Sequence, residues 1–216
     1  MSPQIGRIHI ITDTETQRRY SHLELASLAL RAGIKTIQYR HKTFQPERDG
    51  PELRHIARLI RAHKGQLIIN DFVEVAVEVQ ADGVHLGEDD MPLEEAFRRI
   101  SPSMIIGATV HSLERYAQIK HFPLAYVGVG PVFATHTKSL TNPPLGIEGL
   151  RKFAETIHHP IIAIGGITAE RAKLLFEAVP NLYGVAVISA FCQADDPVKV
   201  ARELLAAIPP AASDLR

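Results

Sequence analysis

The chain has 216 residues, 45% of them hydrophobic, which suits one α/β barrel or one doubly wound domain with a sizeable core. Lys plus Arg and Asp plus Glu number 24 each, and this balance gives no sign of a nucleic-acid-binding surface. No apolar run approaches the roughly 18 residues of a membrane span, and the N-terminal stretch lacks a signal-peptide core. Cys192 is the only cysteine, so an intrachain disulfide is excluded and a cytoplasmic enzyme is expected.

Short apolar runs alternate with helix-length segments along the whole chain. The runs predict strands because they are short and rich in β-branched residues. The segments between them are long enough for helices, and Gly33 fits a helix stop after the first of them. The predicted strands are 8–11, 36–39, 67–69, 84–86, 104–109, 126–129, 161–164 and 184–187. The predicted helices are 21–32, 53–63, 73–79, 93–100, 113–120, 147–157, 169–179 and 197–208.

This alternation, repeated eight times, favours a (β/α)8 TIM barrel over an open sheet. No linker rich in Gly or Ser divides the chain, so residues 1–208 are predicted to form a single barrel domain. The tail 209–216 is small, polar and rich in proline, and we expect it to be flexible. In such barrels the chemistry lies at the carboxyl ends of the strands, so the residues that follow each predicted strand are the candidate site.

Acidic residues follow the third and fourth predicted strands, where Asp71 and Asp90 stand. Because a crossover helix joins these two strands, they should be parallel neighbours, and the two carboxylates should lie within a few ångströms. Adjacent carboxylates repel each other unless a proton or a cation lies between them. Mg2+ binds few carboxylates and shares its shell with water and phosphate oxygens, so we predict a Mg2+ site. The alternative is a solvated loop in which Asp90 caps the next helix.

Gly165 and Gly166 follow the seventh predicted strand and precede a helix. Glycine lets the backbone approach a phosphate closely, and the first N–H groups of a helix are free to donate. Ile188 and Ser189 follow the eighth strand, and the loops after strands seven and eight are the usual phosphate site of these barrels. We therefore predict a phosphate site here. The alternative is that the glycines only form a tight turn.

Three cations, Arg40, Lys42 and Lys138, follow other strands on the same predicted rim. Together with a metal they supply more positive charge than one phosphate monoester needs, which favours a diphosphate ligand over surface charge without a role. Thr135 and Thr137 lie in a polar loop, and their hydroxyls could bind a second anion. His111 stands alone after the fifth strand, and a lone histidine is more often structural than catalytic.

Seven segments of the sequence resemble the thiamin phosphate synthase (thiamine-phosphate pyrophosphorylase) family. Any one of these motifs is weak, but they occur in the family's order and spacing from the first strand to the last helix. The segments are Gln38-x-Arg40-x-Lys42, IINDFVEVA, ADGVHLGEDDMP, YVGVGPVFATHTKS, PPLGIEGL, AIGGIT and GVAVISAF.

The resemblance implies a (β/α)8 transferase that acts on small phosphorylated substrates with Mg2+ as cofactor. The family joins 4-amino-2-methyl-5-pyrimidinylmethyl diphosphate to 4-methyl-5-(2-phosphoethyl)thiazole, or its carboxylated form, and releases pyrophosphate. Its reaction is dissociative: the diphosphate leaves first, and the thiazole nitrogen then attacks a pyrimidine-stabilised carbocation.

The resemblance also implies a role for each matching residue. The metal ligands would be Asp71 and Asp90, and the catalytic cations Arg40, Lys42 and Lys138. The pyrimidine diphosphate would be held by Gln38, Arg40, Lys42, Asn70, Thr109 and Lys138, where Thr109 replaces the usual serine and keeps the hydroxyl. The thiazole phosphate would be held by Thr135, Thr137, Gly166, Ile188 and Ser189.

Two alternative functions remain open at this stage. The segment GATVHSLE also resembles the related thiazole tautomerase, in which a histidine at the position of His111 transfers a proton. A non-catalytic barrel that binds a metabolite of this pathway and acts as a regulator is the second alternative. Asp71, Asp90 and Lys138 favour the synthase, because neither alternative needs a diphosphate clamp. A homo-oligomer is compatible with the sequence, and no membrane or nucleic-acid partner is expected.

Overall fold

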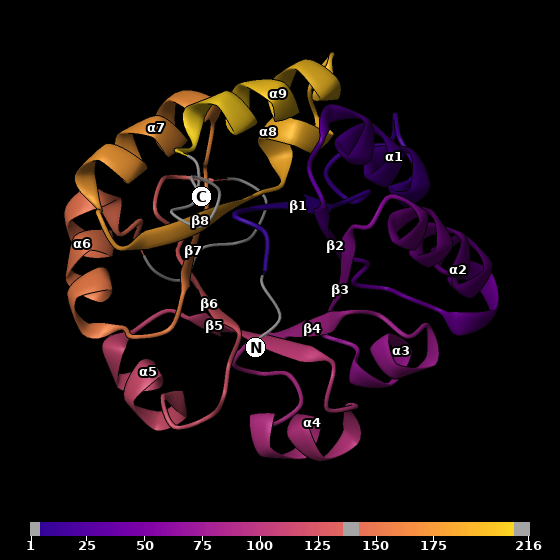
Figure 1. Ribbon diagram of the computed structural model, residues 1–216, viewed down its shortest axis with the longest axis horizontal. Helices are drawn as coiled ribbons and strands as arrows, with labels where there is room; N and C mark the ends of the chain where they lie inside the picture. The colour runs from indigo at the N-terminus through magenta and orange to yellow at the C-terminus, as the bar shows by residue number, and fades with distance from the viewer. Residues whose placement is uncertain (1–4, 136–142, 210–216) are drawn as a thin grey trace.

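The computed structural model describes residues 5–135 and 143–209, and within them the strands form one closed parallel barrel (Figure 1). Each strand pairs with the next along the chain, and β8 pairs with β1 to close the barrel. The predicted (β/α)8 fold is therefore confirmed. The strands are β1 Ile8–Thr12, β2 Thr36–Tyr39, β3 Gln66–Asn70, β4 Gly83–Leu86, β5 Ile105–Val110, β6 Tyr126–Val129, β7 Ile161–Ile164 and β8 Leu182–Val187.

Helices surround the barrel on its outside, as Figure 1 shows. Several begin at a residue whose side chain accepts a hydrogen bond from the first turn, such as Ser21, Ser112 and Thr168. The helices are α1 His22–Ala32, α2 Pro46–Ala62, α3 Val73–Glu78, α4 Leu93–Arg99, α5 Leu113–Ile119, α6 Gly146–Thr156, α7 Ala169–Ala178, α8 Ser189–Cys192 and α9 Pro197–Ala207.

Two elements differ from the sequence-based prediction, and the other boundaries agree within two residues. Helix α2 begins at Pro46, not at residue 53, because Pro46 occupies a first-turn position where its missing N–H is not needed. The polar stretch before Leu53, which contains two prolines, concealed these turns. The short helix α8 was not predicted, since four residues are too few to show a helical repeat. The predicted tail lies, from residue 210 onward, outside the described residues.

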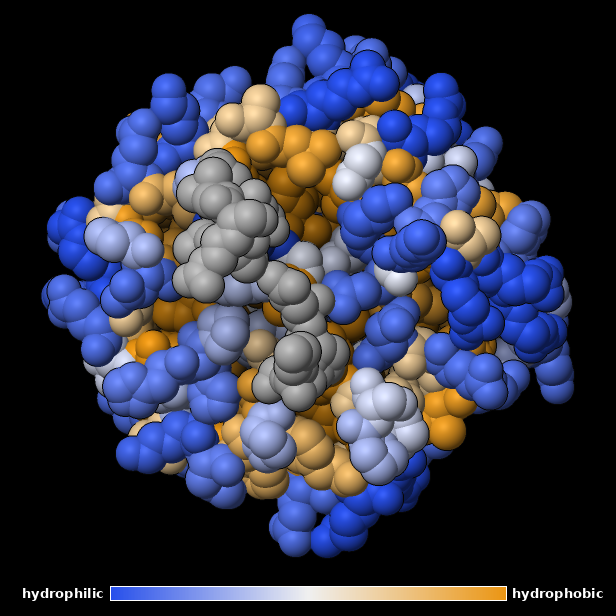
Figure 2. All heavy atoms as spheres, in the orientation of Figure 1, coloured by the Kyte–Doolittle hydropathy of each residue, from blue (hydrophilic) through white to orange (hydrophobic). Residues whose placement is uncertain are grey.

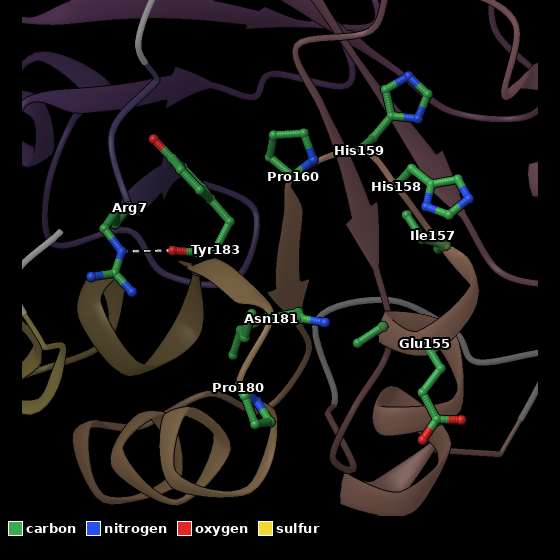
Figure 3. Close-up of a pocket in the computed structure, with 11 residues that line it drawn as sticks. Arg7, Glu155, Ile157, His158, His159, Pro160, Pro180, Asn181 and Tyr183 are labelled. Carbon is green, nitrogen blue, oxygen red and sulfur yellow. Dashed lines mark hydrogen bonds between the residues drawn. The ribbon is translucent and has the colours of Figure 1, made fainter. Parts of the chain in front are cut away.

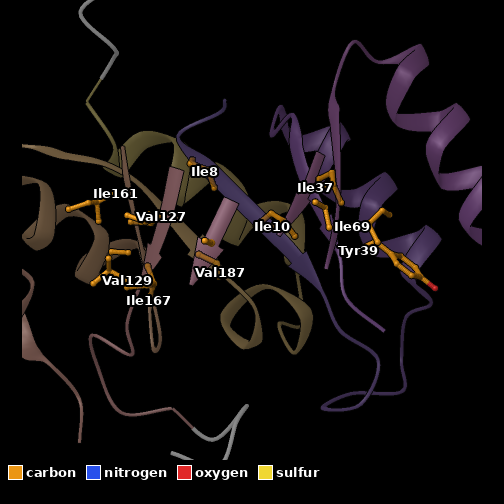
Figure 4. Close-up of a cluster of buried hydrophobic side chains, with 14 of the residues drawn as sticks. Ile8, Ile10, Ile37, Tyr39, Ile69, Val127, Val129, Ile161, Ile167 and Val187 are labelled. Carbon is orange, nitrogen blue, oxygen red and sulfur yellow. The ribbon is translucent and has the colours of Figure 1, made fainter. Parts of the chain in front are cut away.

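Strand side chains alternate between the inside of the barrel and the helices. Figure 4 shows part of the outer core, in which Ile10, Ile37 and Ile69 pack towards the helices. The next position along each strand points inward because successive side chains in a strand lie on opposite faces. A separate buried cluster fills the interior and comes from six strands and the segment before β1: Ile5, Ile11, Ile68, Ile105, Tyr126, Ile162 and Ala186.

The surface view in Figure 2 shows mostly hydrophilic side chains at the periphery and hydrophobic ones nearer the barrel axis. Among the described residues, the exposed large hydrophobic ones lie on three different helices: Val77, Leu174 and Leu205. None of the helices within residues 5–135 and 143–209 combines the length and apolar character required to cross a membrane.

Candidate active site

The strand register determines which loops meet at the carboxyl end of the barrel. Asn70 on β3 pairs with His85 on β4, so the residues after these two strands emerge side by side. Ile164 on β7 pairs with Ala186 on β8, which places the segments after β7 and β8 next to each other in the same way. The two pairs of neighbouring loops contain the predicted metal ligands and the predicted phosphate site.

The carboxyl groups of Asp71 and Asp90 lie close enough for each to affect the pKa of the other. Lys42 Nζ lies 2.5 Å from Asp71 Oδ2 on the same rim. Burial acts to raise the pKa of Asp71, but its bonds to Lys42 and Asp90 outweigh burial and lower the pKa overall. Burial and the Asp71 carboxyl both raise the pKa of Asp90. The pair therefore concentrates negative charge at one point of the rim, and its carboxylates offer oxygen ligands to a cation.

The backbone holds both acids in place. The Asp71 N–H donates to His85 O at 2.9 Å, across the β3–β4 junction. Asp71 has a φ of 70°, in the left-handed region that Asp and Asn tolerate better than other non-glycine residues. The Gly87 N–H donates to Asp90 Oδ2 at 2.6 Å. Both carboxylates are thus oriented towards each other by contacts within the protein.

Arg40 forms a buried ion pair that the sequence did not indicate. Its Nη1 donates to Asp13 Oδ2 and lies 3.4 Å from Glu15 Oε2. The Arg40 side chain is 6% exposed and that of Asp13 is 0% exposed. Arg40 Nε is buried and finds no hydrogen-bond partner among the described residues, so it remains available to a ligand oxygen. Asp13 directly follows β1, as Asp71 directly follows β3. This position at the end of a strand is the sequence feature that could have identified Asp13 as a site residue.

The predicted pyrimidine-binding residues Gln38 and Asn70 are buried, and Thr109 is half-buried. Thr109 Oγ1 lies 2.9 Å from His85 Nε2, and Gln38 hydrogen-bonds to the Tyr126 hydroxyl. Neither His85 nor Tyr126 was assigned a role from the sequence. Both lie beneath the rim, where only a closed barrel brings their strands together.

The loops after β6 and β7 run side by side at the predicted phosphate site. The Phe133 N–H donates to Gly165 O at 3.0 Å. Gly165 and Gly166 have φ of 99° and 63°, values that favour glycine. A Cβ atom on Gly166 would lie 2.6 Å from the carbonyl oxygen of Ala134, the residue before Thr135. Thr135 and Gly166 are therefore close. Ile188 and Ser189 lie at the start of α8, beside this loop pair.

His111 lies on the same rim but is exposed. Its Nδ1 lies 2.8 Å from Gly130 O, and because a carbonyl oxygen only accepts, Nδ1 carries the proton of this bond. This contact fixes the orientation of the ring. Lys138 and Thr137, which the sequence also assigned to the site, lie outside the described residues.

A cavity of about 590 Å3 lies at the opposite, amino end of the barrel. Figure 3 shows Arg7 and Tyr183 on one side of it and His158 and His159 on another. Arg7 Nε donates to Tyr183 O at 2.7 Å, and both ring nitrogens of His159 bond to Tyr116 Oη and Phe122 O. The Arg7 and His159 side chains are thus engaged by the protein itself, and the acidic pair lies at the other end of the strands.

Barrels of this fold work at the carboxyl ends of their strands. Here that end combines adjacent acids, a buried arginine and a glycine-containing loop of the kind that binds phosphate. The protein is a TIM-barrel enzyme whose site suits small phosphorylated molecules.

Comparison with known proteins narrows this class. The family model described as thiamine monophosphate synthase matches residues 8–191. The thiamine-phosphate synthase of Archaeoglobus fulgidus is 41% identical over 198 residues, which are 92% of this chain and 91% of that protein. The enzyme of the same name from Salinibacter ruber is 39% identical over 204 residues, 94% of this chain and 89% of that one. The chain therefore belongs to the thiamine monophosphate synthase family, a family of transferases.

A solved structure agrees with this assignment. The thiamine phosphate pyrophosphorylase from Pyrococcus furiosus aligns with a TM-score of 0.82 and 35% sequence identity. The alignment covers 93% of this chain and 94% of that one, so the likeness extends over most of both chains.

Proposed function

We propose that this chain joins 4-amino-2-methyl-5-pyrimidinylmethyl diphosphate to 4-methyl-5-(2-phosphoethyl)thiazole, or its carboxylated form, to give thiamin phosphate and pyrophosphate. The meeting of Asp71, Asp90 and Lys42 on one rim carries the proposal, because adjacent acids beside cations suit a metal-bound diphosphate. Similarity to synthases over most of the chain supports it. A cytoplasmic location and a homo-oligomeric state stay predictions.

The proposed catalytic residues are Arg40, Lys42 and Lys138. In a dissociative reaction the diphosphate leaves first, and negative charge grows on it as the C–O bond breaks. Cations around the leaving group then stabilise the transition state more than the bound substrate, which raises the rate of the chemical step. The buried, unpaired Nε of Arg40 supports this role, since no partner among the described residues competes with a diphosphate oxygen. No protein nucleophile is needed, because the thiazole nitrogen attacks the carbocation.

Mg2+ is the proposed cofactor, and Asp71 and Asp90 would hold it. The fit rests on two neighbouring carboxyl groups and on an ammonium group that already contacts one of them. The described part of the chain has no cluster of three or more His, Cys, Asp or Glu side chains, so substrate oxygens and water would complete the shell. When bound, Mg2+ supplies further positive charge to the leaving diphosphate.

The two substrates would occupy neighbouring parts of the rim. The buried amides of Gln38 and Asn70 and the hydroxyl of Thr109 are proposed to hold the pyrimidine. The loops after β6, β7 and β8 are proposed to hold the thiazole phosphate and to keep the thiazole nitrogen in line with the reacting carbon. The residues of this second site are Thr135, Thr137, Gly166, Ile188 and Ser189.

Gly166→Ala should raise the KM for thiazole phosphate about tenfold, with a much smaller effect on the KM for the pyrimidine diphosphate. The new Cβ would lie 2.6 Å from Ala134 O and would displace the segment before Thr135. Gly146→Ala is a matched control, because Gly146 has a similar φ of 65° but no described atom lies within 4 Å of its Cβ position. Steady-state kinetics with each substrate varied in turn measure the effect. An equal rise in both KM values would contradict the phosphate assignment.

Lys138→Ala and His111→Asn should separate a synthase from a tautomerase. In a synthase, Lys138→Ala lowers kcat because Lys138 meets charge that develops in the transition state. His111→Asn should retain most of the activity, since His111 is exposed and its contact with Gly130 O is structural. In a tautomerase, loss of the proton-transferring His111 would cost about 10²- to 10⁴-fold in rate and Lys138→Ala little. The assay measures thiamin phosphate formed from both substrates. Isomerisation of the thiazole carboxylate phosphate without thiamin phosphate formation would refute the proposal.

A further inference from the structure

A row of rings crosses the barrel interior beneath the rim. His85 on β4, Gly107 on β5 and Tyr126 on β6 are paired in register, so they lie at one level of the barrel. The rings of His85 and Tyr126 stack over Gly107, with centroids 5.5 Å apart and planes at 20°. His9 packs its edge against the Tyr126 ring with a centroid distance of 5.0 Å. The tyrosine ring is therefore held on two sides.

Glycine at position 107 makes this stack sterically possible. A Cβ atom there would lie 2.1 Å from Cζ and 2.6 Å from Oη of Tyr126. Gly128, the neighbour of Thr109 in register, leaves similar room, because its Cβ would lie 3.1 Å from Cε1 of His85. The backbone of β5 and β6 thus accommodates two rings where side chains would otherwise fill the barrel.

A continuous line of hydrogen bonds runs through these rings between two proposed substrate-binding side chains. Gln38 bonds to the Tyr126 hydroxyl, which lies 3.0 Å from His85 Nδ1. His85 Nε2 lies 2.9 Å from Thr109 Oγ1. Tyr126 is 1% exposed and Gln38 3% exposed, so water does not compete for the bond between these two side chains. The line joins the side chains of β2 and β5 across the barrel.

The donor and acceptor roles of the side chains along this line depend on one another. A neutral imidazole has one donor and one acceptor nitrogen, so the bond at Nδ1 determines the bond at Nε2. The line can run in two directions, and in one of them the Gln38 amide N–H donates to the phenol oxygen. The Tyr126 O–H then donates to Nδ1, and Nε2–H donates to Thr109 Oγ1. This leaves the Gln38 carbonyl as an acceptor and the Thr109 O–H as a donor for a ligand.

We propose that Tyr126 and His85 are positioning residues that fix the hydrogen-bond direction of Gln38 and Thr109, so that the site selects an aminopyrimidine edge. An amino group donates to the Gln38 carbonyl, and a ring nitrogen accepts from the Thr109 hydroxyl. The inference rests on the proposed function, because it takes the pyrimidine substrate to lie against these two residues. Tyr126 and His85 act only through their neighbours and touch no reacting atom.

Tyr126→Phe tests the inference, because it removes the hydroxyl and keeps the ring. We expect the KM for the pyrimidine diphosphate to rise about tenfold and the KM for thiazole phosphate to change less than about twofold. Tyr116→Phe is the matched control: Tyr116 is also buried, and its hydroxyl also bonds to a histidine ring, His159, and to the His158 N–H, but it lies on α5. The control should change neither KM. An equal rise in both KM values for Tyr126→Phe would overturn the inference.

Inhibition by a substrate analogue gives a measurement that would not change if Tyr126 only stabilised the fold. The competitive inhibition constant is measured for the pyrimidine diphosphate and for the analogue that lacks the 4-amino group. Removal of the amino group should weaken inhibition of the wild type about tenfold and of Tyr126→Phe much less, because the Gln38 carbonyl is no longer oriented. Equal losses in both proteins would overturn the inference.

His85→Asn is a second variant in case Tyr126→Phe folds poorly. Asparagine can keep a polar group near the position of Nδ1 but leaves nothing at Nε2, so the line to Thr109 is broken. It should give the same selective rise in KM and the same loss of discrimination, and unchanged discrimination would count against the proposal. If the wild type itself forms no thiamin phosphate from the two substrates, the proposed function fails, and this outcome is distinct from failure of the inference.

Discussion

Asp71→Asn should lower kcat for thiamin phosphate formation by about 10²- to 10³-fold, the loss seen when one preorganised electrostatic contact to developing charge is removed. Asparagine has nearly the same shape and tolerates the φ of 70° at this position, so the backbone should remain in place. The change removes one of the two charges proposed to hold Mg2+, and it also removes the charge that Lys42 contacts. The loss of rate should therefore report electrostatics and not misfolding.

Metal dependence provides the second measurement on this variant. EDTA should abolish wild-type activity and added Mg2+ should restore it, whereas Asp71→Asn should need a higher Mg2+ concentration for half-maximal rate. Asp89→Asn is the matched control, because Asp89 lies in the same loop as Asp90 but is exposed. It should leave the Mg2+ dependence unchanged. Activity that is indifferent to both EDTA and the loss of Asp71 would show that the metal assignment is wrong.

Asp13→Asn should lower the free energy of unfolding by about 3 kcal/mol or more, because it leaves the buried Arg40 guanidinium without its buried partner. Asparagine retains an oxygen that can accept the N–H groups of Glu15 and Thr16, which Asp13 Oδ1 binds at 3.0 and 2.9 Å. The substitution therefore removes charge while preserving the local turn. Glu15, 3.4 Å from Arg40 and partly exposed, compensates only in part. Urea denaturation followed by circular dichroism measures the change.

Asp195→Asn is the control for this prediction. Asp195 also pairs with an arginine, Arg19, at 3.0 Å, but its side chain is 97% exposed. Water and salt screen such a pair, so its loss should leave the urea midpoint almost unchanged. If the two variants shift the midpoint by similar amounts, burial of the Arg40 pair does not contribute as expected.

The sequence by itself determined the alternation of strands and helices and, with it, the meeting of Asp71 and Asp90. The physical reason is local: a βαβ unit places consecutive parallel strands side by side, so acids that follow both strands become neighbours. The same argument applied to the loops after β7 and β8, where glycines mark a backbone conformation that other residues avoid. Patterns that depend on a strand and its next neighbour could thus be predicted from the chain order.

Only the tertiary structure decided the contacts that depend on closure of the barrel or on the steric room inside it. Asp13 was overlooked because a single acid after a strand does not reveal that Arg40, which follows the next strand, will be buried against it. Gln38 and Tyr126 meet across the interior, and neither the spacing nor the type of these residues signals a contact between β2 and β6. Gly107 matters because the Tyr126 ring occupies the space that a side chain at position 107 would fill. That arrangement exists only after all eight strands have closed around Tyr126.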